Sequence, residues 1–172
     1  MSNTDDKNDR MVELAIRVNE GLRRTSAYSV LFNEAVANQV GLNATDLRCL
    51  DFIFRHGPIT PGRLAQLTSL TTGAITGIVD KLEARGFVER QPDPDDRRRV
   101  IVTVLPAAGI AVRPLFASLG EATMALCSQY SADDLATIVD FVERLEPIMQ
   151  DETAKVRAGQ AAAPSVASES KD

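Results

Sequence analysis

Two threonine–glycine pairs recur four residues apart, at Thr72-Gly73 and Thr76-Gly77. In a helix this spacing places all four residues on one face. An interior glycine costs a helix about 1 kcal/mol relative to alanine, so two of them need an explanation. Threonine hydroxyls can bond phosphates or base edges, and glycines would allow a duplex to approach closely. Glycines would equally allow another helix of the same domain to pack closely, and the glycines alone do not separate these explanations.

A second group of residues that could contact a ligand is the run Asp96, Arg97, Arg98 and Arg99, at the end of a proline-containing loop. An arginine at the tip of a loop can enter the minor groove of DNA, where the negative potential is strongest over narrow A·T-rich sequence. Asp96 precedes Arg98 by two residues and can hold its guanidinium by a charge-assisted bond. Taken alone, such a run is more simply a solvated loop whose charges pair with each other.

Two short helices must position the threonine–glycine face. The first begins at Thr60, a hydroxyl residue suited to the N-cap, followed by Pro61 at the first helical position. A second helix is expected over residues 71–85, capped by one of the two threonines at its start and ended by Gly86. Its apolar stripe has the spacing of one helix face: Ile75, Ile78, Val79 and Leu82. Two helices joined by so short a turn predict a helix-turn-helix.

A β-hairpin is predicted directly after this pair of helices. Residues 87–90 and 100–105 suit strands, and the second is rich in β-branched residues. The intervening segment, 91–99, contains two prolines and three aspartates and forms a loop. Placed after a helix-turn-helix, the hairpin is a wing, and its arginines become candidate DNA contacts rather than a solvated run.

The residues of this region resemble the signature of the multiple-antibiotic-resistance regulator (MarR) family. The resemblance lies in residues 82–90 and 93–98, with 74–76 and 79–82 matching the recognition helix, and it is specific over about 43–109. It implies a mainly α protein with a small β-hairpin wing, in which a winged helix-turn-helix is flanked by N- and C-terminal dimerisation helices. It also implies a transcriptional regulator, usually a repressor that leaves DNA when a small molecule binds or a cysteine is oxidised.

The family's DNA-contacting roles carry over to residues of the second helix and the wing. The resemblance implies recognition-helix contacts at Thr71, Thr72, Gly73, Ala74, Thr76 and Gly77, and wing contacts at Asp96 and Arg98, with Arg97 and Arg99 on phosphates. Lys81 and Thr60 are added as candidates on the second helix and at the start of the first. Gly77 stands where many members have an arginine, and Pro106 where many have a threonine cap, so one base or phosphate contact and one cap are missing.

The regulatory signal is left open by the sequence. The resemblance implies a pocket between the dimer helices and the winged domain, which Phe32, Phe52 and His56 could line, although each is more often a core or helix-end residue. Neither Cys49 nor Cys127 has neighbours that would clearly lower a thiol pKa. Ligand binding and oxidation therefore both remain as alternatives.

Five segments are expected along the chain: a disordered N-terminus (1–9), a dimerisation helix (10–40), the winged helix-turn-helix (43–105), further dimerisation helices (106–151) and a disordered tail (152–172). The end helices carry more apolar surface than one subunit can bury, which predicts a homodimer. Such a dimer places its two recognition helices about 34 Å apart and calls for a near-palindromic operator in double-stranded DNA.

The composition limits which other classes of protein are possible. The 172 residues carry a net charge of −5, which argues against indiscriminate coating of nucleic acid but not against binding at specific sites. We expect no membrane span, because no apolar run approaches about 18 residues, and a cytoplasmic location, because the start is acidic and polar. No metal motif, cofactor loop or catalytic pair is recognisable, so an enzyme is disfavoured. A winged-helix module that binds protein instead of DNA is the main alternative.

Overall fold

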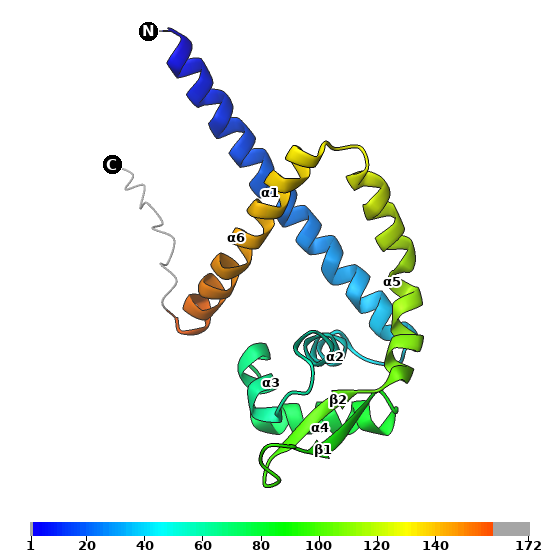
Figure 1. The fold of residues 1–172 in the computed structure, drawn as a ribbon. Coiled ribbons are helices and arrows are strands. Elements are labelled where there is room, and N and C mark those ends of the chain that lie inside the picture. The colour runs from blue at the N-terminus through cyan, green and yellow to red at the C-terminus, as the bar shows by residue number, and fades with distance from the viewer. Residues whose placement is uncertain (1, 160–172) are drawn as a thin grey trace, which may run out of the picture. The chain divides into compact units, whose positions relative to one another are not determined.

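The computed structural model describes residues 2–159, with side chains from residue 7, and within them the chain is mostly helical with one β-hairpin (Figure 1). The chain divides into two compact units, and the division falls within one helix, between residues 118 and 119. In chain order the elements are α1 (Ser2–Gln39), α2 (Ala44–His56), α3 (Pro61–Thr68), α4 (Thr72–Ala84), β1 (Val88–Pro92), β2 (Val100–Val104), α5 (Pro106–Cys127) and α6 (Ala132–Arg157). This confirms the predicted fold class.

The helix starts of the winged domain follow from local capping chemistry. Asn43 and Asp46 form a reciprocal capping box at the start of α2. Thr60 caps α3 ahead of Pro61, and Thr71 caps α4. Ser69, between α3 and α4, adopts a left-handed conformation (φ 54°), which turns the chain sharply from one helix into the next. The predicted helix-turn-helix is therefore present.

The core of this domain is formed by apolar residues of α2, α3, α4 and the hairpin. Its most deeply buried side chains are Ile53, Leu64, Ile75, Val79, Leu82, Val88, Val102 and Cys49. Three of these, Ile75, Val79 and Leu82, belong to the apolar stripe predicted for α4. Burial of this stripe fixes which face of α4 points outward.

The hairpin pairs β1 and β2 in antiparallel register, from Val88 opposite Val104 to Pro92 opposite Val100. The structure also contains an isolated β-bridge that was not predicted from the sequence. It joins Ile59 to Val102 of β2, with N–O distances of 3.1 and 2.8 Å. This bridge fixes the start of α3 against the base of the wing.

The first helix begins earlier than predicted. α1 starts at Ser2, so residues 2–9, expected to be disordered, are helical in the structure. Their polarity does not prevent this, because extending a formed helix is far easier than nucleating one. At the other end α6 reaches Arg157, beyond the predicted limit of 151. The remainder of the predicted tail, from residue 160, lies outside the described residues.

One described helix, α5, is long and apolar enough to cross a membrane by length and composition alone, with a mean hydropathy of 1.3 over 18 residues. The expectation that no segment approaches this limit was wrong, because Arg113 and Glu121 interrupt the apolar run without lowering its average enough. None of that window is buried within the chain. A helix that packs against a second subunit has the same composition, so this single helix is weak evidence for a membrane span.

Candidate nucleic-acid interface

The outward face of α4 is formed by the two threonine–glycine pairs. The helix begins where the Thr71 hydroxyl accepts a hydrogen bond from the Ala74 amide at 3.2 Å. Because the apolar stripe of the helix is buried, the opposite face, comprising Thr72, Gly73, Thr76 and Gly77, is exposed. Polar and small side chains thus cover the surface of the helix that is free to meet a partner.

The two glycines do not admit any neighbouring element among the described residues. A Cβ atom built on Gly73 or Gly77 would meet no described atom within 4 Å. The explanation that the glycines admit a neighbouring helix of the same domain therefore has no support in the fold. Close approach of an external partner remains as the reason for two helix-weakening residues on this face.

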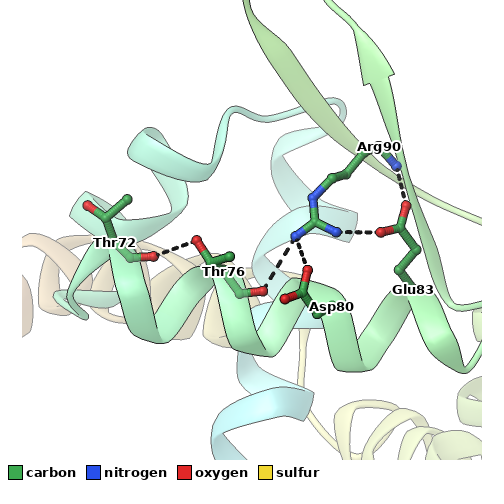
Figure 2. A network of polar contacts seen from close by, with 5 residues as sticks. All are labelled: Thr72, Thr76, Asp80, Glu83 and Arg90. Atoms are coloured by element: carbon green, nitrogen blue, oxygen red, sulfur yellow. Dashed lines mark hydrogen bonds and ion pairs between the residues drawn. The ribbon is translucent and has the colours of Figure 1, made fainter.

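The hydroxyls on this face are partly engaged within the helix. Thr76 Oγ1 donates to the carbonyl oxygen of Thr72 at 3.0 Å (Figure 2), and its lone pairs can still accept from a donor. Thr60, at the start of α3, accepts a hydrogen bond from the Arg63 amide at 3.2 Å. The structure thus gives Thr60 a capping role whether or not it contacts DNA.

Lys81 forms an ion pair that was not predicted from the sequence. Its ammonium forms an ion pair with Asp46 of α2, whose side chain is only 3% exposed. The same Asp46 oxygen also accepts from the Asn43 amide at 3.1 Å. The pairing favours a role for Lys81 in holding α4 against α2 over the predicted role as a DNA contact.

Arg85 holds the end of α4 against the end of α1. Its Nη1 donates to the carbonyl oxygen of Val40 at 3.0 Å, and its guanidinium lies against Gly41, where a Cβ would come within 2.5 Å of Nη1. Gly41 also has a positive φ of 64°, so the close approach and the turn both require glycine. The roles of Arg85 and Asp46 are not predicted from the sequence, because Val40 and Lys81, with which they pair, are 45 and 35 residues away.

The wing carries its arginines at an exposed tip. As predicted, Asp96 holds Arg98: its Oδ1 accepts from the Arg98 backbone amide at 3.1 Å and from Nε at 3.2 Å. These bonds lower the pKa of the Asp96 carboxyl below its ordinary value. The Arg98 side chain is nevertheless 92% exposed. Asp96 therefore braces the Arg98 backbone and Nε while leaving most of the side chain open to a partner.

The other two tip arginines differ in their partners. Arg99 lies 3.7 Å from a carboxylate oxygen of Asp93, which is largely buried, whereas Arg97 makes no ion pair with any residue whose side chain is described. Asp93 also accepts a hydrogen bond from the Asp95 amide at 3.0 Å, whereas the Asp95 residue itself is exposed. Two of the three loop carboxylates, those of Asp93 and Asp96, therefore hold the loop, and the exposed tip carries its three arginines beside Asp95.

A cluster of charges joins the wing to α4 and was not predicted. Arg90 of β1 lies over α4, where it contacts Asp80 and Glu83 (Figure 2). Burial lowers the pKa of Arg90, but the hydrogen bonds that its guanidinium donates to the carboxylates of Asp80 and Glu83 outweigh this effect, and the net shift of the pKa is upward. Glu83 and Arg90 belong to the family-like segment 82–90 and Asp80 to the segment 79–82, but their pairing depends on how β1 folds back onto the helix.

Away from this surface, a cleft of about 790 Å³ lies between α1, α2, β2 and the N-terminal part of α5. Its lining is mainly apolar, with three arginines at Arg48, Arg55 and Arg113. Arg55 is paired with Asp51 at 2.8 Å. No carboxylate among the described side chains pairs with the other two arginines.

The residues predicted for an effector pocket do not line this cleft. Phe32 packs edge-on against Phe116, a cleft residue, with ring centroids 5.3 Å apart. Phe52 stacks on His56 at 5.8 Å, at the end of α2. Of these three residues Phe32 contacts a wall of the cleft, whereas the walls themselves are formed by other residues of α1, α2, β2 and α5.

The cysteines differ in environment. Cys49 is buried in the core, and burial raises the pKa of its thiol to about 11. Cys127, at the end of α5, is half-buried. Among side chains 7–159 no group of three histidine, cysteine or acidic residues is arranged to hold a metal ion.

A helix-turn-helix with an exposed polar second helix, followed by an arginine-tipped hairpin, defines a winged helix-turn-helix protein of the DNA-binding kind. The sequence model described as the MarR family matches residues 42–100. The uncharacterized HTH-type transcriptional regulator YcgE of Bacillus subtilis (strain 168) is 40% identical over 135 residues, which are 78% of this chain and 88% of that protein. The multiple antibiotic resistance protein MarR of Salmonella typhimurium (strain LT2) is 30% identical over 107 residues, 62% of this chain and 74% of that protein.

The fold is also shared with solved structures. That of Streptococcus pneumoniae FabT in complex with DNA gives a TM-score of 0.62 at 20% identity and covers 80% of this chain and 98% of that chain. The chain belongs to the MarR family. It is a DNA-binding transcriptional regulator and, like its relatives, not an enzyme.

Proposed function

We propose that this protein is a homodimeric repressor that binds a near-palindromic operator. In this proposal the threonine–glycine face of α4 enters the major groove, and Arg98 at the wing tip enters the adjacent minor groove, with Arg97 and Arg99 on phosphates. The observation that supports it most is the open space in front of Gly73 and Gly77. Helix-weakening residues facing outward are explained by a partner that must come within van der Waals distance of the backbone.

The homodimer in this proposal accounts for apolar surface that the chain leaves uncovered. The large hydrophobic residues exposed on α1, α5 and α6 include Met11, Val12, Leu14, Ile16, Val18, Val30, Leu31, Ile110, Leu119, Met124, Leu126, Ile138, Val139, Phe141, Val142, Ile148 and Met149. Large apolar side chains exposed in such numbers on three helices are typical of surfaces that bind another protein chain. A two-fold pairing through these helices would present two α4 helices about 34 Å apart, one turn of B-DNA.

The DNA-binding part is tested by an electrophoretic shift with the DNA upstream of the protein's own gene. The affinity should fall steeply as salt is raised from about 50 to 200 mM, because several phosphates are neutralised. A matched pair of variants sharpens the test: Arg98→Ala should weaken binding, whereas Arg144→Ala, which removes another exposed arginine from α6, should not. An absent or salt-insensitive shift would favour the alternative, a winged-helix module that binds protein.

As the regulatory part of the proposal, a small molecule that binds the cleft between α1, α2, β2 and α5 releases the operator. The cleft's apolar walls and its two unpaired arginines, Arg48 and Arg113, suit an apolar molecule that carries an anionic group. Oxidation of Cys49 is disfavoured, because a thiol with a pKa of about 11 is almost entirely protonated at neutral pH. The regulator would act in the cytoplasm, on chromosomal DNA.

The ligand part is tested by calorimetric titration with a series of aromatic carboxylates and their uncharged amides. Carboxylates should bind and lower operator affinity, while the amides should bind far more weakly. Arg113→Gln should remove this preference without changing operator affinity in the absence of ligand. Equal binding of acids and amides would contradict the assignment of an anion to the cleft.

A further inference from the structure

The contacts of Arg90 join the wing to the recognition helix itself. Its Nη2 donates to Asp80 Oδ1 at 2.6 Å and to the carbonyl oxygen of Thr76 at 3.4 Å. Its Nη1 donates to the Glu83 carboxylate, and its backbone amide donates to Glu83 Oε1 at 3.1 Å. One residue of β1 therefore reaches two turns of α4, one of them at a residue of the exposed face (Figure 2).

These contacts lie at the base of the hairpin, where a small rotation is amplified. Arg90 is in the middle of β1, which ends at Pro92, and the centre of the loop lies about five residues beyond Arg90, which even an extended chain would span in at most about 16 Å. A tilt of roughly 10° at Arg90 would move the tip by up to about 3 Å, which is enough to break a hydrogen bond at the tip. The orientation of the wing thus depends on how firmly its base is held.

We propose that Arg90 is a positioning residue that sets the angle between the wing and α4, so that both engage one duplex together. The proposal rests on the proposed function, in which Arg98 and the threonine–glycine face contact the same operator. A guanidinium suits the task because its planar fork can bind two carboxylates and a carbonyl oxygen at fixed angles, which an ammonium cannot. Arg90 itself, with a largely covered side chain, contacts no DNA.

A second role for the same residue makes a different prediction. Asp80 is exposed and lies one helical turn after Thr76, so without Arg90 its bare carboxylate would repel approaching phosphates. If Arg90 only masked the charge of Asp80, neutralising Asp80 would restore the DNA affinity that is lost when Arg90 is replaced. If Arg90 positions the wing, neutralising Asp80 would not restore this affinity.

The test compares operator affinities of wild type, Arg98→Ala, Arg90→Met and the double variants. Arg98→Ala alone should weaken binding by about 5- to 150-fold. Arg90→Met should weaken it to a similar extent, and adding Arg98→Ala should cost less than about twofold more, because a misplaced wing has no contact left to lose. Losses that multiply, or recovery of wild-type affinity in Arg90→Met/Asp80→Asn, would overturn the proposal.

A measurement without DNA separates this inference from the proposed function. A nitroxide on Arg97→Cys, in a Cys127→Ser background, reports the mobility of the wing tip by its electron paramagnetic resonance line. Arg90→Met should sharpen this line, Arg90→Lys should sharpen it less, and Arg144→Met, which breaks an exposed ion pair on α6, should leave it unchanged. An unchanged line in a folded Arg90→Met dimer would overturn the positioning role, whereas an Arg98→Ala variant with full affinity would overturn only the wing's contact with DNA. Should Arg90→Met not fold, the line shape and affinity of Arg90→Lys decide in its place.

Discussion

Replacement of Gly77 by alanine should raise stability and lower DNA affinity at once. Gly77 lies inside α4 with no described atom within 4 Å of the position that a Cβ would take, so the added methyl costs nothing in the fold. Alanine is favoured over glycine in a helix by about 1 kcal/mol, which should raise the Tm by about 2–4 °C for a chain of this size. On the DNA side the same methyl fills space that the duplex needs. Overpacking of this kind costs about 1–3 kcal/mol, or about a 5- to 150-fold loss of affinity.

The assay pairs thermal unfolding with operator binding by fluorescence anisotropy. Gly120→Ala in α5 is the control for helix propensity, because its added Cβ also meets no described atom and it lies outside the threonine–glycine face and the wing. Since α5 belongs to the proposed dimer surface, size-exclusion chromatography should show this variant to be a dimer before its DNA affinity is compared. Gly77→Leu extends the series and should abolish binding while the dimer stays folded. A lower Tm for Gly77→Ala would show that the glycine packs inside the protein. Full affinity in Gly77→Leu would remove this face from the interface.

Three further substitutions or titrations follow from the contacts. Lys81→Met should lower the free energy of unfolding by about 1–3 kcal/mol, because it leaves a buried carboxylate of α2 unpaired, and chemical denaturation measures this. Asp96 should titrate below its ordinary pKa of 3.8, because its ionised form is held by Arg98. Its stabilisation of the wing should therefore be complete above pH 3.8 and be lost as the pH falls through the lower pKa of the folded state. A carboxyl carbon-13 titration with a midpoint above 3.8 would contradict this. At pH 8 iodoacetamide should alkylate Cys127 well before Cys49, whose thiol has a pKa of about 11; mass spectrometry showing equal rates would count against its burial.

Local patterns were sufficient to predict the elements that carry the proposed interface. The cap at Thr71, the buried stripe and the end near Gly86 follow from residues within one or two turns of each other, so α4 and its exposed face were placed correctly. The same holds for the Asp96–Arg98 pair, whose partners are two residues apart. Contacts between residues so close in the sequence can be predicted from the sequence alone.

The contacts that hold these elements together could not be predicted in this way. Lys81 and Asp46 are 35 residues apart, and Arg85 and Val40 are 45 apart, so their meeting depends on the packing of whole helices. The sequence therefore predicts Lys81 as a DNA contact, whereas its ion pair with Asp46 appears only in the folded chain. The single bridge at Ile59 has no pattern at all, because one residue cannot show the alternation of a strand.

The cleft likewise could not be predicted from local sequence patterns. Phe32, Phe52 and His56 were chosen by residue type, but the walls are formed where α5 passes α2, and the arginines that give the cleft its character occupy ordinary exposed helix positions. Their convergence is visible only in the folded chain.

The central claim is that twin α4 helices and wings contact one duplex in neighbouring grooves. Chemical footprinting of a bound operator tests this most directly, with dimethyl sulfate for the major groove and hydroxyl radicals for the minor groove. We expect two major-groove patches about 34 Å apart, each flanked by minor-groove protection that disappears in Arg98→Ala. Uniform protection along the duplex, or a footprint unchanged by both Gly77→Leu and Arg98→Ala, would contradict the account.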